Sequence, residues 1–227
     1  MKKIAKENIF YKRNLPHIHP RDGIFFITFR LADSLPTNVL EKLKEEKDSE
    51  IKLLEKKFNK NKKEFDREKY NLEKRYFAKF DKWLDRSSEG PKWLKDVLIA
   101  TTIANKIHEL NSTRYRLIAY CIMSNHVHLL IDIREFNIIT GTNISGKTKD
   151  YPLSDTLRFI KGSTARLCNI HLGRTGAFWH HESYDHYVRN EDELRGIGQY
   201  ILNNPVKAGL VDDWRQWKFS YLENNVT

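Results

Sequence analysis

The stretch that decides the fold reads Arg114-Tyr-Arg-Leu-Ile-Ala-Tyr-Cys-Ile122, then Met123-Ser-Asn125, then His126-Val-His-Leu-Leu-Ile-Asp-Ile133. Its two longer runs are rich in aliphatic, aromatic and β-branched residues, which favours strands. The three residues between them have the length and polarity of a hairpin connection. The sequence therefore predicts an antiparallel β-hairpin as the first piece of a sheet.

Further strands and helices are expected on both sides of this hairpin. The runs at 23–31 and 183–189 have the composition or the alternation of strands. Apolar residues at helical spacing predict a helix over 91–110 and another for which Ser154 is the expected N-cap. Asn190, with Glu193 three residues on, resembles a capping box that opens a last helix, expected to stop before Pro205.

A long charged segment separates the first strand from the first of these helices. There is no Gly or Pro between Pro36 and Gly90, and residues 41–76 hold thirteen Lys/Arg and ten Asp/Glu. Such charge density fits a solvated helix that projects from the core. Apolar residues occupy only one of the two heptad positions that a coiled coil requires. The segment could therefore form one long helix or a helical hairpin that turns near 59–62. The segment could dimerise, contact DNA or bind another protein.

Together the elements predict an α+β fold. Their order fits a ferredoxin-like or RRM-like β-α-β-β-α-β sandwich with one antiparallel sheet, an extra C-terminal helix and a long charged helical insertion. We expect residues 1–36 and 91–227 to form one domain and residues 37–90 to form the insertion.

Composition limits the class of protein. The 227 residues carry a formal charge of +10 with a pI near 9.4, which favours polyanionic partners such as nucleic acid without proving them. Cys121 and Cys168 lack metal-site spacing, and a disulfide framework is not expected. The N-terminus has no apolar core of a signal peptide, and no run reaches the roughly 18 apolar residues of a membrane span. We therefore expect a soluble cytoplasmic protein.

Two groups of residues could carry chemistry. His126 and His128 stand at i and i+2 in a predicted strand, so both point to one face and could hold one ion, although such pairs also occur as incidental polar positions. Tyr200, Asn203 and Asn204 cluster on one face of the last helix. Spacing alone leaves this cluster open to a plainer interpretation, a helix end with a tyrosine at the core's edge.

A resemblance to a known family changes this balance. It rests on six blocks in order: Asn14-Leu-Pro-His-Ile18, Phe26-Ile-Thr-Phe-Arg-Leu-Ala-Asp33, Met123-Ser-Asn-His-Val-His-Leu-Leu130, Phe178-Trp179, Tyr184-Asp-His-Tyr-Val-Arg189 and Tyr200-Ile-Leu-Asn-Asn-Pro-Val-Lys-Ala-Gly-Leu210. Taken together, the chain resembles the REP-associated tyrosine transposases, which are HUH single-strand nucleases. The resemblance covers nearly the whole chain except the charged insertion. Ser124 replaces the family's usual proline, and His180 a frequent glutamine.

The resemblance implies a reaction and a set of site residues. His126 and His128 match the HUH pair that holds a divalent ion, Mg²⁺ or Mn²⁺, and Asn204 matches a further ligand. Tyr200 matches the nucleophile that cuts single-stranded DNA and forms a 5′-phosphotyrosine. The expected partner is single-stranded DNA, in hairpin-forming repeats, bound by a monomer or a homodimer.

The candidate DNA contacts come from charge and aromatic character rather than from a motif. They are Arg114 and Arg116 on a predicted strand, Arg158, Lys161 and Arg166 on a basic helix, and Trp179 and Tyr184 as stacking platforms. Two other functions stay open. The chain could be a domesticated binder of structured single strands that does not transpose, or a metal phosphohydrolase that uses water, in which Tyr200 would be structural.

Overall fold

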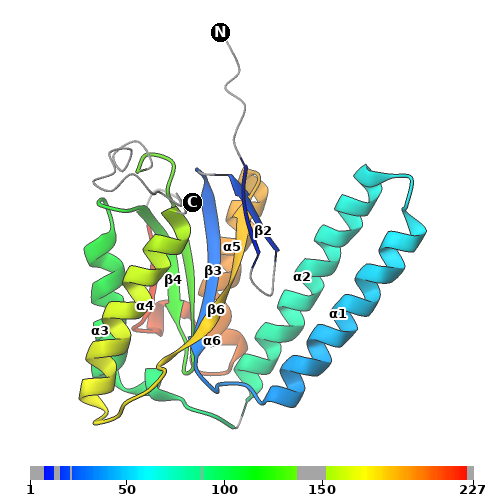
Figure 1. The fold of residues 1–227 in the computed structure, drawn as a ribbon. Helices are drawn as coiled ribbons and strands as arrows, with labels where there is room; N and C mark the ends of the chain where they lie inside the picture. The colour runs from blue at the N-terminus through cyan, green and yellow to red at the C-terminus, as the bar shows by residue number, and fades with distance from the viewer. Residues whose placement is uncertain (1–7, 13–15, 21, 88, 137–151, 224–227) are drawn as a thin grey trace, which may run out of the picture. The chain divides into compact units, whose positions relative to one another are not determined.

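The computed structural model describes residues 8–12, 16–20, 22–87, 89–136 and 152–223 (Figure 1). The chain forms two compact units, one made of residues 33–92 and the other of residues 1–32 and 93–227. The expected polar loop before Pro152 falls mostly on 137–151, outside the described residues.

A five-stranded antiparallel sheet is the frame of the larger unit. Along the sheet the strands follow the order β6 (Trp179–Val188), β3 (Ile24–Leu31), β5 (His126–Asp132), β4 (Arg116–Ile122) and β7 (Ser220–Leu222). The hairpin predicted from residues 114–133 is β4 paired with β5, which makes β5 the middle strand. The α+β class and the antiparallel sheet predicted from the sequence are confirmed.

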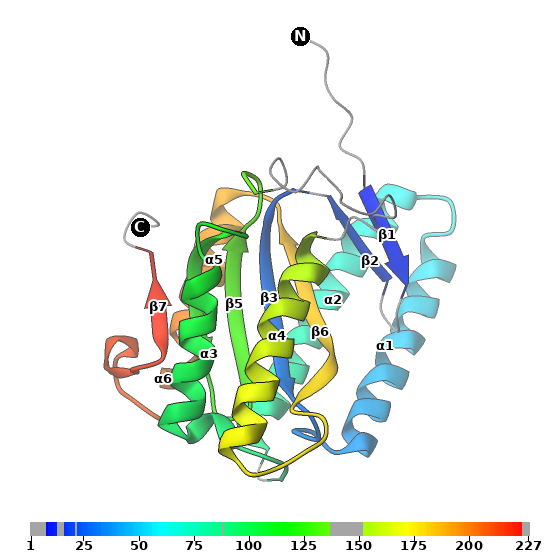
Figure 2. The ribbon, with the colours of Figure 1, turned by 60° about the vertical axis from the view of Figure 1, so that its left-hand side comes forward.

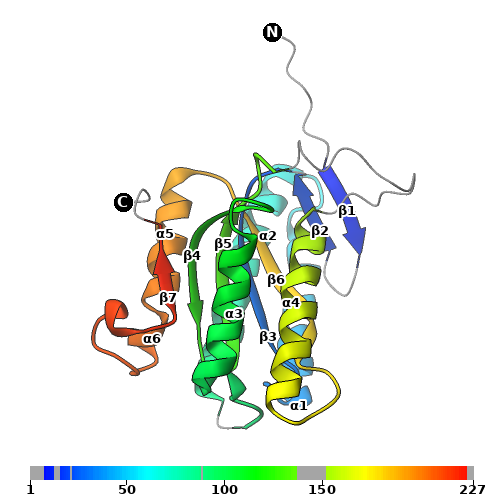
Figure 3. The ribbon, with the colours of Figure 1, turned by 90° about the vertical axis from the view of Figure 1, so that its left-hand side faces the viewer.

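Helices cover both faces of this sheet. In Figure 2, α3 (Val97–Leu110) and α4 (Pro152–His171) lie in front of the sheet, with α5 (Glu191–Leu202) behind it. Figure 3 shows α3 and α4 side by side, in agreement with their direct packing, while α5 packs against β4, β5 and β7. The order β3, α3, β4, β5, α4, β6, α5 is the order expected from the sequence.

The main core lies between the sheet and the α3–α4 layer. Phe25, Ile27 and Phe29 alternate along β3 and are at most 1% exposed, as are Ile103 and Ile107 on α3. Side chains of this size each contribute about 1.5–3 kcal/mol when fully buried. This face therefore holds the sheet in place and leaves the opposite face of β3 and β5 available for polar side chains.

Helix boundaries differ from the predictions where local capping decides them. The helix expected from Pro91 begins at Val97, because Asp96 Oδ1 accepts from the backbone N–H groups of Leu98 and Ile99. A short 3-10 turn, η1 (Trp93–Lys95), precedes it. The expected cap Ser154 lies inside α4, which already begins at Pro152. By contrast, Asn190 caps α5 by accepting from the N–H of Glu193, as predicted.

Five further short elements were not expected from the sequence. A separate two-stranded hairpin pairs β1 (Asn8–Lys12) with β2 (Pro16–Pro20). Near the C-terminus, α6 (Asn204–Lys207) and the 3-10 turn η2 (Trp214–Gln216) lead into β7. These elements are too short for a periodic pattern to identify them.

The smaller unit is a helical hairpin, the second of the two arrangements left open by the sequence. Helix α1 (Thr37–Lys57) packs against α2 (Lys62–Arg86), and Asn61 caps α2 through the N–H of Glu64. Ion pairs join the helices, Arg75 to Glu50 at 3.2 Å and Lys79 to Glu46 at 3.3 Å. Such exposed pairs contribute about 0–1 kcal/mol each, so they orient the helices more than they stabilise them.

The two ends of this smaller unit meet. Gly90 adopts φ +79°, and a Cβ atom there would collide with the backbone carbonyl oxygen of Asp33. Only glycine combines this left-handed conformation with so close an approach at little cost. The chain therefore enters and leaves the unit at one point.

In the described part of the chain, no helix has both the length and the apolar character needed to cross a membrane. Both cysteines are buried.

The burial of Cys168 gives a direct test of the core. Burial raises the pKa of this thiol to about 11, because desolvation disfavours the thiolate. The thiolate is the reactive form, so we expect iodoacetamide at pH 8 to alkylate Cys168 about 100-fold more slowly in the folded chain than in urea. Mass spectrometry of the labelled peptide measures both rates. Equal rates would contradict the buried position.

Candidate metal and nucleophile site

His126 and His128 lie on the face of β5 that points away from the α3–α4 layer. Val127 and Leu129, between and after them, belong to the main core. Both histidines are at most 1% exposed, and their Nε2 atoms are 3.1 Å apart. The alternation predicted from the sequence thus brings the two imidazoles together on one face.

Two neighbours hold the outer nitrogens of these rings. Asn125 Oδ1 lies 2.7 Å from His126 Nδ1, and Thr28 Oγ1 lies 2.7 Å from His128 Nδ1. Because an amide oxygen only accepts, His126 donates from Nδ1, which in the neutral imidazole leaves the lone pair on Nε2. The Thr28 hydroxyl can accept in the same way. Both rings can therefore present Nε2 lone pairs towards one point.

The register of the sheet explains the position of Thr28. It is paired with His128 on one side and with Tyr184 on the other. Directly opposed residues on neighbouring strands share a face, so Thr28 reaches the imidazole across a single strand spacing. A signal for Thr28 is visible in the sequence, since Thr28 and Arg30 alternate with core residues in an otherwise apolar strand.

Helix α5 brings Tyr200 to the same face. The ring centroid of Tyr200 lies 5.7 Å from that of His128 and 6.1 Å from that of Phe26, edge-on in both cases. Such tilted contacts are favourable aromatic geometries. The predicted ligand pair and the predicted nucleophile are therefore neighbours in space, although 72 residues separate His128 from Tyr200 in the sequence.

Asn204 follows Tyr200 by one helical turn, at a break in the helix. The expected stop before Pro205 is a discontinuity: α5 ends at Leu202, and α6 contains both Asn204 and Pro205. Asn204 is 1% exposed, and among the described residues neither polar atom of its side chain has a hydrogen-bond partner. An unsatisfied buried amide costs about 1–3 kcal/mol, which is unusual unless a ligand satisfies it. Asn203, the third member of the predicted cluster, is exposed.

These donors fit a divalent cation. Two nitrogens bound to one ion at about 2.1 Å lie roughly 3.0–3.4 Å apart, close to the spacing of the paired Nε2 atoms. Imidazole nitrogens suit several divalent transition ions, whereas oxygen donors favour harder ions such as Mg²⁺ and Mn²⁺.

Asp132 shares the histidine face but lies at the far end of β5. Four residues beyond His128 correspond to about 13 Å along a strand. Burial alone would raise the pKa of Asp132, yet hydrogen bonds from Arg134 and the charge of Arg116 hold it below its usual value. Asp132 is thus an arginine partner. Arg116, one of the predicted DNA contacts, is paired with it at 3.5 Å and with Glu223 at 3.4 Å.

Three further candidate DNA contacts lie on the opposite side of the sheet, with α4. Arg114 is in the turn before β4 rather than on the strand, and its guanidinium stacks on Phe159 of α4 at 3.7 Å. Arg158 and Arg166 are exposed on α4, and Arg158 pairs with Asp155 at 3.2 Å. The structure therefore does not bring these arginines together with Tyr200.

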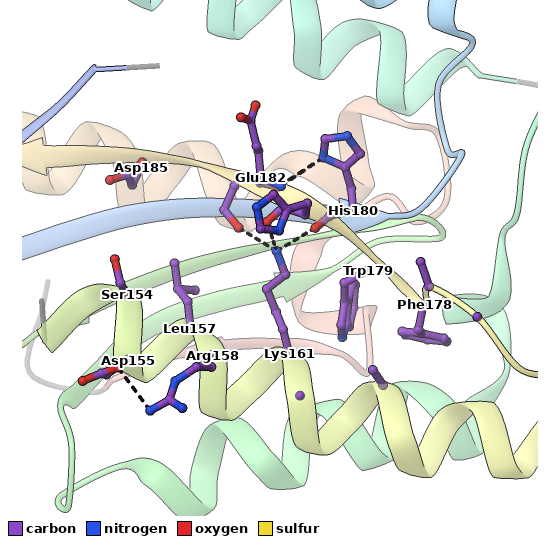
Figure 4. Close-up of a pocket in the computed structure, with 16 residues that line it drawn as sticks. Ser154, Asp155, Leu157, Arg158, Lys161, Phe178, Trp179, His180, Glu182 and Asp185 are labelled. Atoms are coloured by element: carbon purple, nitrogen blue, oxygen red, sulfur yellow. Dashed lines mark hydrogen bonds and ion pairs between the residues drawn. The ribbon is translucent and has the colours of Figure 1, made fainter. Parts of the chain in front are cut away.

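A cavity of about 570 Å³ lies between α4 and the edge strand β6 (Figure 4). Lys161 spans it and donates to the backbone oxygens of His180 at 2.7 Å and His181 at 3.0 Å. Burial, and next the charge of Arg30, lower the pKa of His180, so this imidazole is neutral at pH 7. The hydrogen bonds of the Lys161 ammonium thus connect α4 to β6.

The two predicted stacking residues have different surroundings. Trp179 is 6% exposed, donates from Nε1 to Thr164 Oγ1 at 2.9 Å and packs edge-on against Phe29. Its indole belongs to the core and is one of the residues that line the cavity between α4 and β6. Tyr184 is half-buried on the histidine face, 6.2 Å from Phe26 between ring centroids. Tyr184 and Tyr200 both contact the ring of Phe26, so Tyr184 shares a neighbour with the predicted nucleophile.

Comparisons with known proteins agree with the resemblance seen in the sequence. The chain is similar to a curated Haemophilus influenzae protein described as "Putative REP-associated tyrosine transposase", with 25% identity over 112 residues. The match covers 49% of this chain and 61% of the relative, so it spans about three fifths of the relative's length. No family model matches the chain. The description of this relative confirms the resemblance to the REP-associated tyrosine transposases.

One solved structure also aligns with the chain. It is described as "Structure of the REP associates tyrosine transposase bound to a REP hairpin". The alignment covers 97% of this chain and 82% of that one, with a TM-score of 0.44 and 14% identity. At this TM-score the likeness supports no argument about function.

The role of Thr28 in holding His128 can be measured without a nucleic acid. We expect Thr28→Val to weaken Mn²⁺ binding about 10- to 100-fold, the usual effect of removing the outer partner of a ligating histidine. Thr28→Ser keeps the hydroxyl and should bind Mn²⁺ nearly as the unchanged chain does. Isothermal titration calorimetry gives the affinities. Equal affinities for the valine and serine variants would show that the hydroxyl does not support the ligand.

Proposed function

We propose that this chain is a divalent-metal-dependent endonuclease and strand transferase for single-stranded DNA that acts through a 5′-phosphotyrosine on Tyr200. The observation that carries the proposal is the contact of the Tyr200 ring with His128, one of two buried histidines with converging Nε2 atoms. A phenol beside a cation site is suited to attack on a phosphodiester.

His126, His128 and Asn204 are the proposed ion ligands. The 3.1 Å spacing of the Nε2 atoms supports this set, as does the buried amide of Asn204, which has no hydrogen-bond partner among the residues that the structure describes. Bound there, Mg²⁺ or Mn²⁺ would stabilise negative charge on the phosphate oxygens. Asn125 and Thr28 hold the rings in the orientation that ligation requires.

The chemical step is a transesterification. The Tyr200 hydroxyl oxygen forms a bond to phosphorus, and the bond between phosphorus and the 3′ oxygen of the preceding nucleotide breaks. The phenol loses its proton to water, and the departing 3′ oxygen takes one up. Phe26 and His128 pack edge-on against the Tyr200 ring and restrict its motion. Restricting the nucleophile in this way favours attack by reducing the entropy lost in the step.

The same residues can reverse the reaction. The phosphotyrosine bond replaces one phosphate ester with another, so a different 3′-hydroxyl can displace Tyr200 and rejoin the strand without ATP. One site could therefore both cut and rejoin DNA, which is what a transposase requires.

Single-stranded DNA that folds into hairpins is the proposed substrate. The similarity to a protein described as a REP-associated tyrosine transposase supports this class, as does the formal charge of +10. A domesticated binder that does not cut, and a phosphohydrolase that uses water, make different predictions about a covalent product.

A labelled hairpin oligonucleotide tests the chemistry. With Mn²⁺ or Mg²⁺ we expect a protein–DNA adduct that survives denaturing electrophoresis, because the phosphotyrosine bond is covalent. Tyr200→Phe should abolish the adduct and EDTA should prevent it, whereas the matched control Tyr221→Phe, on β7 and stacked on Tyr120, should retain it.

The other two functions give distinct results in this assay. Cleavage that survives Tyr200→Phe and leaves no adduct would identify water as the nucleophile. Tight binding of the hairpin with no cleavage in either metal would identify a binding protein.

A further inference from the structure

Helices α5 and α6 form one nearly continuous surface despite the break between them. Asn203, at the junction, has helical backbone angles of φ −76° and ψ −4°. Its carbonyl oxygen accepts from the N–H of Lys207 at 2.9 Å, as the carbonyl of Asn204 does from Ala208 at 3.0 Å. Tyr200, Asn204 and Lys207 therefore follow at i, i+4 and i+7, the spacing of one helical face.

Lys207 extends back along this face to the tyrosine. Its Nζ lies 4.5 Å from the centroid of the Tyr200 ring. The ring thus has Phe26 and His128 as edge-on neighbours and an ammonium over its face. Lys207 is itself exposed, and in the described part of the chain no carboxylate forms an ion pair with it.

This free charge sets Lys207 apart from most of the basic residues predicted to contact DNA. Arg116 is paired with two carboxylates, and Arg158 with one. Lys161 donates to two backbone oxygens and to Ser183. A cation that is already paired has fewer N–H donors available for a phosphate. The N–H donors of the Lys207 ammonium are available to bind an incoming anion.

The reaction proposed above needs positive charge at this position. Attack by the phenol adds negative charge to the phosphate oxygens, and a preorganised cation beside them stabilises that charge. A lysine ammonium is a compact charge on a flexible four-carbon stem, so it can leave the ring face for an oxygen of the same phosphate.

We propose that Lys207 is a catalytic residue of this site, whose ammonium binds a non-bridging oxygen of the phosphate that Tyr200 attacks. This inference rests on the proposed function and adds to it a charged group that the ion ligands do not supply. The ammonium keeps its proton throughout, so the bonds made and broken are those of the transesterification alone.

A structural role for Lys207 would give a different result. If the ammonium only packs on the tyrosine ring, its loss should change folding or ring position and leave no preference for a charged replacement. The test therefore compares Lys207→Met with Lys207→Arg. Lys218→Met is the matched control, because Lys218 is also exposed and its Nζ lies 5.5 Å from the ring centroid of Phe219.

The experiment measures adduct formation in single turnovers over a range of hairpin oligonucleotide concentrations with Mn²⁺. We expect Lys207→Met to lower the maximal rate about 10- to 100-fold and the half-saturating concentration to change less than about 3-fold. Lys207→Arg should recover most of the rate, and Lys218→Met should match the unchanged chain. Thermal unfolding of each variant shows whether it is folded.

The outcomes distinguish the role of Lys207 from the tyrosine chemistry on which it rests. Adducts in the unchanged chain together with an undiminished rate in Lys207→Met would overturn the role of Lys207 and leave the tyrosine chemistry standing. A fall in rate that arginine does not restore would also overturn it, in favour of packing. No adduct in the unchanged chain with either metal would overturn both.

Discussion

Successive side chains of a β-strand must point to opposite faces, and the site depends on how β5 meets this constraint. As the middle strand it is buried on both sides, so its apolar residues fill the main core while His126 and His128 occupy the other face. Buried imidazoles need partners, and Asn125 and Thr28 supply them. A slip of one residue between β3 and β5 would send Thr28 into the core and separate it from His128. The packing of the core and the orientation of the imidazoles therefore depend on one register.

Local patterns in the sequence predict much of this frame. The β4–β5 hairpin, the helices and the Asn190 cap follow from alternation, helical spacing and capping chemistry, which act over a few residues. The approach of Tyr200 to His128 is different, because it depends on how α5 packs across the sheet. Spacing left Tyr200 open to a structural interpretation, and only the resemblance to a family pointed to the nucleophile.

Charge patterns in the sequence say little about which face a basic residue will occupy. Arg114, Arg158 and Arg166 are candidate DNA contacts because they are basic, and they lie with the α3–α4 layer on the side of the sheet opposite His126 and His128. Lys161 and Trp179 are engaged within the fold. The sequence alone does not relate Lys207 to Tyr200, because Pro205 lies between them and indicates the end of a helix. Because the backbone at Asn203 stays helical, Lys207 lies on the same helical face as Tyr200, seven residues earlier, and its ammonium contacts the tyrosine ring.

The meeting of Asp33 with Gly90 has a consequence for how this chain could have changed. Because the two ends of this unit already lie together, the unit closes a loop, and closing a loop costs entropy. That entropy grows with the logarithm of the loop's length, so doubling the number of residues costs only about 0.6 kcal/mol. Lengthening or shortening the α1–α2 hairpin between these two points would thus cost little closure entropy, so the size and charge of this unit could vary between related chains.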